Sequence, residues 1–357
     1  MQGAAGAVTR GGARVEAGRE ASQLHSRGFH GTPQPGGALD LSWAEAAYLV
    51  EVGRLAVMER GAALSLGQIL ERGQAQDDRF ETRYLVYRDL RERGFVVREE
   101  PPTAGVDFTV RERGGTAKAP SKYWVLAASE RGEMRPAEVH DWADRAAGLG
   151  KVPLVAVVDE EGDLTYYEFG AGLEGPVPEA PGAVEPIDAV LVGDHVLVDG
   201  PRAQALHGPP WHFGKPLKLL LRLSLLEATW LFQRGALTVR GGTADGPPAG
   251  ADALRGASAA QQPDFDLRLA AYAALRDRRL VPKTGFKYGV HFRVYASGEG
   301  RAHARFLVHA IEGRKVVAWP ELSRAVRLSH GVRKQLAYGL VDAGGRVRFL
   351  RVRWTRP

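Results

Sequence analysis

The spacing of apolar positions changes along the chain from a helical to an alternating pattern, and it does so twice. In the second half, apolar residues recur at helical spacing in LSLLEATWLF (223–232) and again over 265–279, which predicts two helices. Ser42 and Ser224 precede matching helices in the two halves, each with a glutamate three residues later, a pattern typical of a helix N-terminus. An amphipathic helix is also expected over 319–335. The runs that predict strands are GVHFRVY (289–295), ARFLVHAI (304–311), KVVAWPEL (315–322), KQLAYGLVD (334–342) and VRFLRVRW (347–354).

The two halves resemble one another at a displacement of roughly 182–185 residues. Five ordered matches indicate a tandem duplication of a domain pair, because a solenoid would need more copies and a shorter period. The matches are LHSRGFHGTP (24–33) with LHGPPWHFGKP (206–216), LSWAEAAYLVEVGRLAV (41–57) with LSLLEATWLFQRGALTV (223–239), FETRYLVYRDLRERGFVV (80–97) with FDLRLAAYAALRDRRLVP (265–282), GVDFTVR (105–111) with GVHFRVY (289–295), and LVAVVDEEGDLTYYEF (154–169) with LAYGLVDAGGRVRFLRV (336–352).

Each copy is expected to have two parts, a small α/β part followed by a helix and a mixed sheet, so we expect an α/β fold of the mixed (α+β) type. The Pro/Gly-rich, acidic segment GAGLEGPVPEAPGAVEP (170–186) predicts a linker between the copies. The expected divisions are a disordered tail over 1–15, the two parts of copy one over 16–75 and 76–170, a linker over 171–187, the first part of copy two over 188–242, a second linker over 243–262, and the last part over 263–357.

Composition narrows the class of protein. The chain has no cysteine, which excludes disulfides and thiolate metal sites and fits a reducing cytoplasm. Its most apolar stretch, over 217–232, is interrupted by Lys218, Arg222 and Glu227 and is too short to span a bilayer, so we expect a soluble cytoplasmic protein without a membrane partner.

Charge divides the copies more sharply than the net value of +6 suggests. Residues 1–200 contain 21 Lys and Arg against 32 Asp and Glu, whereas residues 201–357 contain 27 against 10. This asymmetry predicts that the second copy binds a polyanion. The alternative, that arginine-rich solvated faces carry no function, does not explain why the copies differ in sign.

Three polar residues of copy two are candidates for chemistry: Tyr295, His303 and Lys334. The first two are absent from copy one, where the alignment places Arg111 and Pro120, while Lys151 matches Lys334. Singly, a tyrosine on a strand is most often a packing residue and a histidine at a strand start a surface residue. Duplicated copies share what the fold needs, however, so their differences point to function.

A base, an acid and a fixed cation suffice to cleave RNA without a metal ion. The base takes the proton of the ribose 2′-OH, the acid protonates the leaving 5′-oxygen, and the cation stabilises the charge of the phosphorane. Histidine suits the acid, because its reference pKa is about 6.5. Tyrosine has a reference pKa of about 10 and needs neighbouring cations, such as Lys334 or Arg327, to act as the base.

The segments TGFKYGVHFRVY (284–295), HARFLV (303–308) and VRLSHGVRKQLAYGLVD (326–342) resemble the C-terminal signature of the archaeal tRNA-splicing endonucleases. The duplicated layout resembles the class that works as a homodimer of two-repeat chains. The resemblance implies cleavage of precursor tRNA at both junctions of a bulge-helix-bulge, with no cofactor, giving 2′,3′-cyclic phosphate and 5′-hydroxyl ends. It also implies that Tyr295 is the general base, His303 the general acid and Lys334 the transition-state cation.

The resemblance implies further roles outside this triad. Arg327 and Arg353 match two arginines that hold a bulge base across the dimer. An acidic loop of the non-catalytic copy should dock into a basic groove of a partner, and DEEGD supplies it, with Asp159, Glu160, Glu161 and Asp163. The chain departs from the family at His291, where aspartate is usual and where copy one has Asp107, so a structural role is expected there.

Two other functions are compatible with parts of this pattern. One is a metal-dependent nuclease with a related restriction-endonuclease-like core, which would need clustered carboxylates beside a lysine. The other is a non-catalytic RNA-binding assembly subunit, which would not need Tyr295, His303 and Lys334 together.

Overall fold

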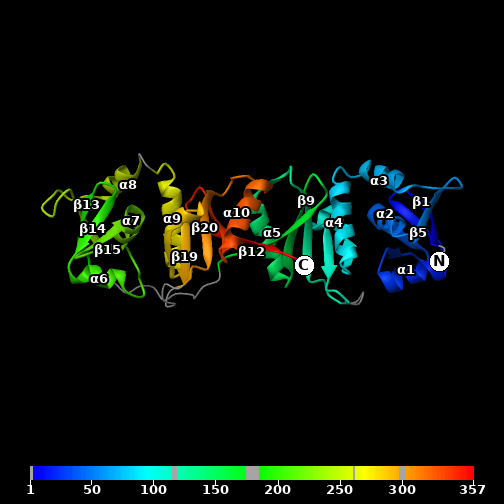
Figure 1. Cartoon of the computed structure of the whole chain (residues 1–357), viewed down its shortest axis with the longest axis horizontal. Coiled ribbons are helices and arrows are strands. Elements are labelled where there is room, and N and C mark those ends of the chain that lie inside the picture. The colour runs from blue at the N-terminus through cyan, green and yellow to red at the C-terminus, as the bar shows by residue number, and fades with distance from the viewer. Residues whose placement is uncertain (1–2, 115–118, 174–184, 260–261, 297–302) are drawn as a thin grey trace. The chain divides into compact units, whose positions relative to one another are not determined.

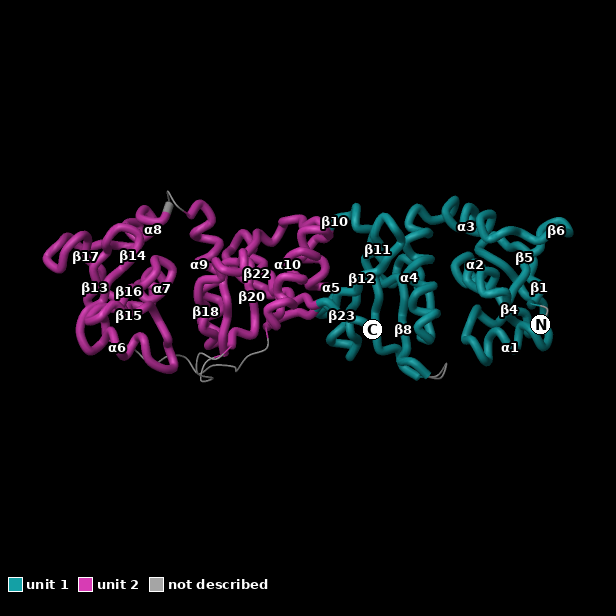
Figure 2. The backbone as a smooth tube through the Cα atoms, viewed as in Figure 1, with its two compact units in different colours: residues 1–133, 142–169, 354–357 teal, residues 134–141, 170–353 magenta. Residues whose placement is uncertain are grey.

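The computed structural model describes residues 3–114, 119–173, 185–259, 262–296 and 303–357. The glycine-rich turn expected at 297–302 and most of the linker expected at 171–187 lie outside these ranges. The chain divides into two compact units, which Figure 2 shows in teal and magenta: unit 1 holds residues 1–133, 142–169 and 354–357, and unit 2 holds residues 134–141 and 170–353.

Unit 1 begins with a small mixed sheet whose strands run in the order β3-β4-β2-β1-β5-β6. The elements of this N-terminal subdomain are β1 (Ala4–Thr9), β2 (Gly12–Val15), α1 (Arg19–Gly28), β3 (Thr32–Pro33), β4 (Leu39–Ser42), α2 (Trp43–Glu51), β5 (Leu55–Glu59), β6 (Ala62–Ala63) and α3 (Leu66–Gln74). The expected disordered tail over 1–15 is therefore wrong. β1 pairs antiparallel with β2 and parallel with β5, and these backbone bonds order a Gly/Ala-rich segment whose side chains carry little strand signal.

The second subdomain of unit 1 packs a long helix on a mixed sheet whose strands run in the order β12-β11-β9-β8-β7. The elements of this part of copy one are α4 (Phe80–Glu92), β7 (Val96–Glu99), the 3-10 turn η1 (Pro102–Ala104), β8 (Phe108–Arg111), β9 (Tyr123–Ser129), β10 (Glu133–Met134), α5 (Pro136–Gly148), β11 (Val152–Val158) and β12 (Leu164–Ala171).

Unit 2 contains the same two subdomains in the same order (Figure 1). Its N-terminal subdomain has the strand order β15-β16-β14-β13-β17. The elements are β13 (Ile187–Val192), β14 (His195–Asp199), α6 (Pro201–His207), β15 (Lys215–Leu217), β16 (Leu220–Ser224), α7 (Leu225–Gln233), β17 (Leu237–Gly241) and α8 (Ala251–Ala259). α8 corrects the linker expected over 243–262: Leu254 is fully buried, and the helix packs against α7 and α9.

The last subdomain has the strand order β18-β19-β20-β22-β23. Its elements are α9 (Phe265–Asp277), β18 (Leu280–Thr284), the 3-10 turn η2 (Phe286–Tyr288), β19 (Phe292–Ala296), β20 (Phe306–Glu312), β21 (Val317–Ala318), α10 (Trp319–Gly331), β22 (Gln335–Val341) and β23 (Val347–Thr355). The strand expected over 315–322 is only two residues long, because Pro320 lies in the first turn of α10, where proline favours a helix.

The duplication predicted from the sequence is confirmed by equivalent pairings. β1 and β5 are parallel in copy one, as β13 and β17 are in copy two, and β9 with β11 corresponds to β20 with β22. The predicted helix caps are also found: Ser42 with Glu45, and Ser224 with Glu227, form complete capping boxes at α2 and α7. The fold is thus a mixed α/β fold, built twice.

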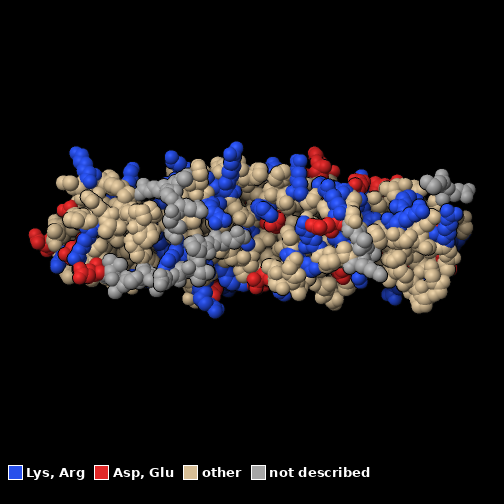
Figure 3. Space-filling model, turned by 90° about the horizontal axis from the view of Figure 1, so that it is seen from below, with Lys and Arg blue, Asp and Glu red and all other residues tan. Residues whose placement is uncertain are grey.

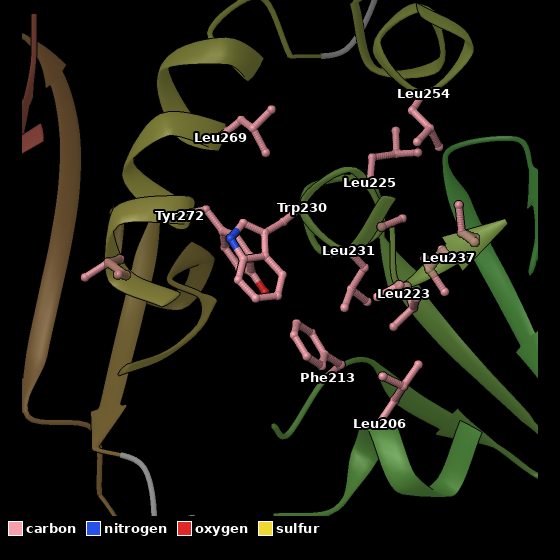
Figure 4. Close-up of a cluster of buried hydrophobic side chains, with 14 of the residues drawn as sticks. Leu206, Phe213, Leu223, Leu225, Trp230, Leu231, Leu237, Leu254, Leu269 and Tyr272 are labelled. Atoms are coloured by element: carbon pink, nitrogen blue, oxygen red, sulfur yellow. The ribbon is translucent and has the colours of Figure 1, made fainter. Parts of the chain in front are cut away.

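One apolar core joins the two subdomains within unit 2. Figure 4 shows Trp230 of α7 lying beside Tyr272 of α9, with Phe213 and Leu231 beneath them. Trp230 and Tyr272 are almost fully buried, and Phe213 is fully buried. Because these side chains come from both subdomains, the N-terminal subdomain packs against the helix that covers the sheet of the second subdomain.

Candidate active site

Strand register brings Tyr295 and Lys334 to the same end of the sheet in unit 2. Val294 pairs with Phe306, and Phe306 pairs in turn with Gln335. The next positions along these strands are Tyr295, Arg305 and Lys334, and the pairing continues there through Arg305 N–H to Val294 O (2.9 Å) and Gln335 N–H to Arg305 O (3.1 Å). Since neighbouring strands lie about 4.8 Å apart, the backbones of Tyr295 and Lys334 are about 10 Å apart.

Tyr295 lies on the sheet face that points away from α9. Phe292 and Val294 belong to the core cluster with α9, so alternation directs Arg293 and Tyr295 to the opposite face, as predicted. Both side chains are half-buried. The Arg293 guanidinium carbon lies 5.7 Å from the centre of the Tyr295 ring, so a cation accompanies the phenol.

His303 is the first described residue after residues 297–302, and it precedes β20. It is exposed and lies two residues before Arg305, the residue level with Tyr295. Ala304 beside it is buried, which ties the start of this strand to the core. His303 therefore lies at the same end of the sheet as Tyr295 and Lys334.

Lys334 is held where α10 ends and β22 begins. Its backbone N–H donates to Ser329 O (2.9 Å), and the preceding Arg333 adopts a left-handed conformation with φ of 55°. The Lys334 ammonium donates to Val332 O (3.2 Å) and lies 5.7 Å from the centre of the Tyr288 ring. This tight turn fixes the point from which the cation projects.

In copy one, the place of Tyr295 holds a different group while the place of Lys334 keeps a lysine, and both side chains have local partners. Val110 pairs with Tyr123, and Tyr123 with Val152, so Arg111 and Lys151 occupy the places of Tyr295 and Lys334. Arg111 Nε donates to Ala119 O (2.8 Å), and Lys151 Nζ donates to Ser121 O (2.5 Å). Both cations therefore donate hydrogen bonds to nearby backbone carbonyl groups. Copy one has Pro120, and no imidazole, at the position of His303.

Arg327 and Arg353 lie on other elements of unit 2. Arg327 is exposed on α10, next to the buried Val326, and Arg353 is exposed on β23, next to the buried Val352. Strand register does not align either arginine with Tyr295. Figure 3 shows lysine and arginine side chains spread over the visible face of unit 2 rather than gathered in one place.

The acidic loop of copy one is a tight turn between β11 and β12. Asp159 Oδ1 accepts the N–H groups of Glu161 (3.0 Å) and Asp163 (2.9 Å), and Gly162 has a φ of 84°. The side chains of Asp159, Glu160, Glu161 and Asp163 are exposed. One ion pair crosses this surface, from Arg131 to Glu160 at 3.3 Å.

Copy two builds the same turn without most of these acids. Asp342 Oδ1 accepts the N–H groups of Gly344 (2.9 Å) and Arg346 (2.9 Å), and Gly345 has a φ of 77°. The turn therefore needs the first aspartate and the glycine, whereas Glu160 and Glu161 are replaced by Ala343 and Gly344. The two glutamates are not required by the backbone.

At the position of His291 the two copies use different pairs of polar side chains. In copy one, Asp107 binds Arg79 through two bonds of 3.2 and 2.8 Å and accepts the Ala127 N–H at 2.8 Å. In copy two, His291 Nδ1 accepts the Ala310 N–H at 3.1 Å, and Nε2 lies 3.3 Å from Asp264. The sequence shows this difference once the copies are aligned, because Arg79 precedes α4 in copy one where Asp264 precedes α9 in copy two.

His291 therefore has the expected structural role. It stacks on His309 with ring centres 4.2 Å apart. Burial, followed by the charges of His309 and Arg268, lowers the pKa of His291 to about 4 against the opposing effect of Asp264. Both the backbone bond and the stacking use the neutral imidazole.

A second difference lies where each N-terminal subdomain meets the next helix and sheet. In copy two, Lys283 donates to the buried Glu227 at 2.8 Å. Near the equivalent carboxyl of copy one, that of Glu45, lies Glu99, which accepts from Ser42 Oγ at 2.5 Å and which strand register aligns with Thr284 and not with Lys283. Burial, followed by the charge of Glu45, raises the pKa of Glu99 to about 7. This part of copy one also lines a cleft of about 630 Å³.

Neither a metal-binding cluster nor a membrane-spanning helix occurs in the described parts of the chain. Within those residues, no three His, Asp or Glu side chains come together in a way that could hold a metal ion. Every helix described is too short or too polar to cross a bilayer.

Comparison with known proteins matches the whole duplicated layout. The family model "tRNA intron endonuclease, N-terminal domain" matches residues 9–70 and 187–246, and "tRNA intron endonuclease, catalytic C-terminal domain" matches residues 80–166 and 265–349. The chain is 37% identical to a tRNA-splicing endonuclease of Methanosarcina mazei over 95% of this chain and 96% of that one. It is 33% identical to a tRNA-splicing endonuclease of Methanococcoides burtonii over 91% and 92%, and 34% identical to one of Halobacterium salinarum over 93% and 94%.

Proposed function

Because the chain belongs to the tRNA intron endonuclease family and is a tRNA-splicing endonuclease, we propose that it cleaves precursor tRNA at the exon–intron junctions of a bulge-helix-bulge without a metal ion. Tyr295 removes the proton of the ribose 2′-OH, and the 2′-oxygen attacks the adjacent phosphorus. His303 gives its proton to the leaving 5′-oxygen, so the bond to that oxygen breaks and the products carry 2′,3′-cyclic phosphate and 5′-hydroxyl ends. The Lys334 ammonium stabilises the charge that develops on the phosphorane oxygens.

The observation that carries this proposal is that Tyr295 and Lys334 are level with one another in the strand register. His303 lies two residues before Arg305, the residue of the intervening strand that is level with both. A backbone separation of about 10 Å is one that a phenol and an ammonium on long side chains can bridge to a single phosphate. Copy one supports the same interpretation, because it has Arg111 at the place of Tyr295, and the guanidinium of Arg111 binds the local carbonyl of Ala119.

We propose that Arg327 and Arg353 hold an unpaired bulge base between two guanidinium planes, a mode of recognition suited to a flipped-out nucleotide. We further propose that the chain works as a homodimer in which the 159–163 turn docks into a basic groove of the partner. The exposed Glu160 and Glu161 support this role, since the equivalent turn of copy two keeps its backbone without them.

The experiment that tests the proposal is cleavage of a bulge-helix-bulge RNA in excess chelator, followed by analysis of the product ends. We expect unchanged cleavage with 2′,3′-cyclic phosphate and 5′-hydroxyl ends. Activity that disappears with chelator and returns with a divalent ion would favour a metal-dependent nuclease. Binding without cleavage under every condition would favour a non-catalytic RNA-binding subunit.

A further inference from the structure

The η2 turn of copy two presents an aromatic side chain to solvent from a fixed backbone. Phe286 is 87% exposed, whereas the next-but-one residue, Tyr288, is half-buried. The turn is closed by Tyr288 N–H to Gly285 O (2.8 Å) and by Gly285 N–H to His291 O (3.0 Å). A Cβ atom at Gly285 would lie 2.6 Å from Val290, so the close approach at this position requires glycine.

This turn lies beside the proposed catalytic cation. The ammonium of Lys334 is 5.7 Å from the centre of the Tyr288 ring. Phe286 belongs to the same turn of 3-10 helix, two residues before the ring that lies next to the cation that we assign to the scissile phosphate. Lys287, between them, is exposed and adds positive charge.

Copy one shows that the fold does not need these aromatic rings. It forms the same 3-10 turn, η1, and ends it in the same way, with Gly105 at a φ of 67° against 63° for Gly289. The residues at the places of Phe286 and Tyr288 are Pro102 and Ala104. The aromatic pair therefore occurs only in the copy that carries Tyr295 and His303.

We propose that Phe286 stacks on an unpaired base of the substrate RNA, next to the phosphate that is cleaved. This inference rests on the function proposed above and adds a recognition residue to that site. An unpaired base offers an aromatic face, and stacking on a phenyl ring needs no hydrogen bond, so it suits a side chain that projects freely. The adjacent Lys287 and Lys334 attract the phosphates on either side of that base.

The test compares Phe286→Ala with Leu219→Ala. Leu219 is a matched control, because it is 85% exposed in the N-terminal subdomain of the same copy. The probe is a bulge-helix-bulge RNA with 2-aminopurine at each bulge position in turn, bound in excess chelator. We expect Phe286→Ala to weaken binding by about 5- to 100-fold and to restore 2-aminopurine fluorescence at one position. Phe286→Trp should retain binding, and Leu219→Ala should change neither measurement.

Salt dependence separates stacking from charge. Phe286→Ala removes no cation, so the slope of log affinity against log salt should stay as in the unaltered protein, whereas Lys287→Ala should reduce it. RNA binding and fluorescence unchanged in Phe286→Ala, while the unaltered protein still cleaves, would overturn this inference alone. A change in sedimentation without a change in RNA stacking would assign Phe286 to a contact between protein chains and also overturn it. Failure of the unaltered protein to cleave would instead overturn the proposed function.

Discussion

Replacing Lys283 by methionine should destabilise unit 2 in a pH-dependent way. The side chain of Glu227 is 8% exposed, and its carboxylate accepts N–H groups from Gly214 and Ser224, both at 3.0 Å, besides the Lys283 ammonium. Burial acts on this carboxyl to raise its pKa, but Lys283, followed by the Ser224 N–H and Arg276, outweighs that effect and holds the pKa below its usual value. Removing one partner of a buried ion pair costs about 3–5 kcal/mol, and we expect about 3 because Lys283 is partly exposed.

Copy one indicates what the carboxyl does without its cation. Glu45 accepts equivalent N–H groups, from Gly31 at 2.7 Å and Ser42 at 3.0 Å, but the neighbouring charged group is the carboxyl of Glu99 and not an ammonium. Burial is then the main influence and raises the pKa of Glu45. In Lys283→Met the pKa of Glu227 should likewise rise above its unfolded value, so the stability of the variant should fall as pH rises from the unfolded pKa through the folded one. The loss relative to the unaltered protein should therefore be larger at pH 8 than at pH 5.

Native-state hydrogen exchange measures this loss directly. Peptides that cover α7 and β18 report the free energy of opening at the two pH values, and Lys287→Met serves as the control because Lys287 is exposed. A loss below about 1 kcal/mol, or an equal loss at pH 5 and pH 8, would refute the reasoning about a buried, cation-dependent carboxylate.

Four other predictions follow from the site and the copies. Tyr295→Phe should slow single-turnover cleavage by about 100-fold or more while RNA affinity stays within about 2-fold, because only the proton acceptor is lost; equal losses in both would remove Tyr295 as the base. His303→Ala should slow cleavage similarly and recover with a substrate whose leaving oxygen needs no protonation, and no recovery would remove it as the acid. Reversing the charges of Glu160 and Glu161 should give an inactive protein that sediments as a monomer, whereas an unchanged dimer contradicts docking of the turn. Because the pKa of Glu99 is raised to about 7, the opening free energy of unit 1 should fall between about pH 4.5 and pH 7 by about 1–3 kcal/mol, and Glu99→Gln should abolish this dependence; a curve unchanged by the substitution contradicts it.

The sequence predicted those parts of the fold that depend on local pattern. Both capping boxes at Ser42 and Ser224 were visible, because a cap needs only residues three positions apart. Comparison of the copies also predicted that Arg111 and Lys151 match Tyr295 and Lys334, and the strand pairings confirm this, since duplication carries register with it. The roles of the candidate site residues, including Arg327, Arg353 and the acidic turn, stay predictions.

What could not be predicted depends on distant pairing. The strand β1 pairs with β5, more than forty residues away, and its Gly/Ala-rich sequence gives no clear strand signal. The helix α8 was mistaken for a linker because, among its described residues, Leu254 is the one large apolar side chain that is buried. The exchange of His291 for Asp107 was visible as a substitution, but its partner at the start of α9 is brought to it only in three dimensions. The pairing of Lys283 with Glu227 likewise joins two subdomains and has no signal in the sequence.

The central claim is that Tyr295, His303 and Lys334 of copy two act on the same phosphate. A crystal structure of the protein with a bulge-helix-bulge RNA that carries a 2′-deoxy nucleotide at the junction tests it most directly. We predict that the oxygen of Tyr295 faces the 2′ position while the imidazole of His303 contacts the 5′-oxygen and Lys334 contacts a non-bridging oxygen. A junction phosphate bound away from these three side chains, or bound by a divalent ion among carboxylates, would contradict the claim.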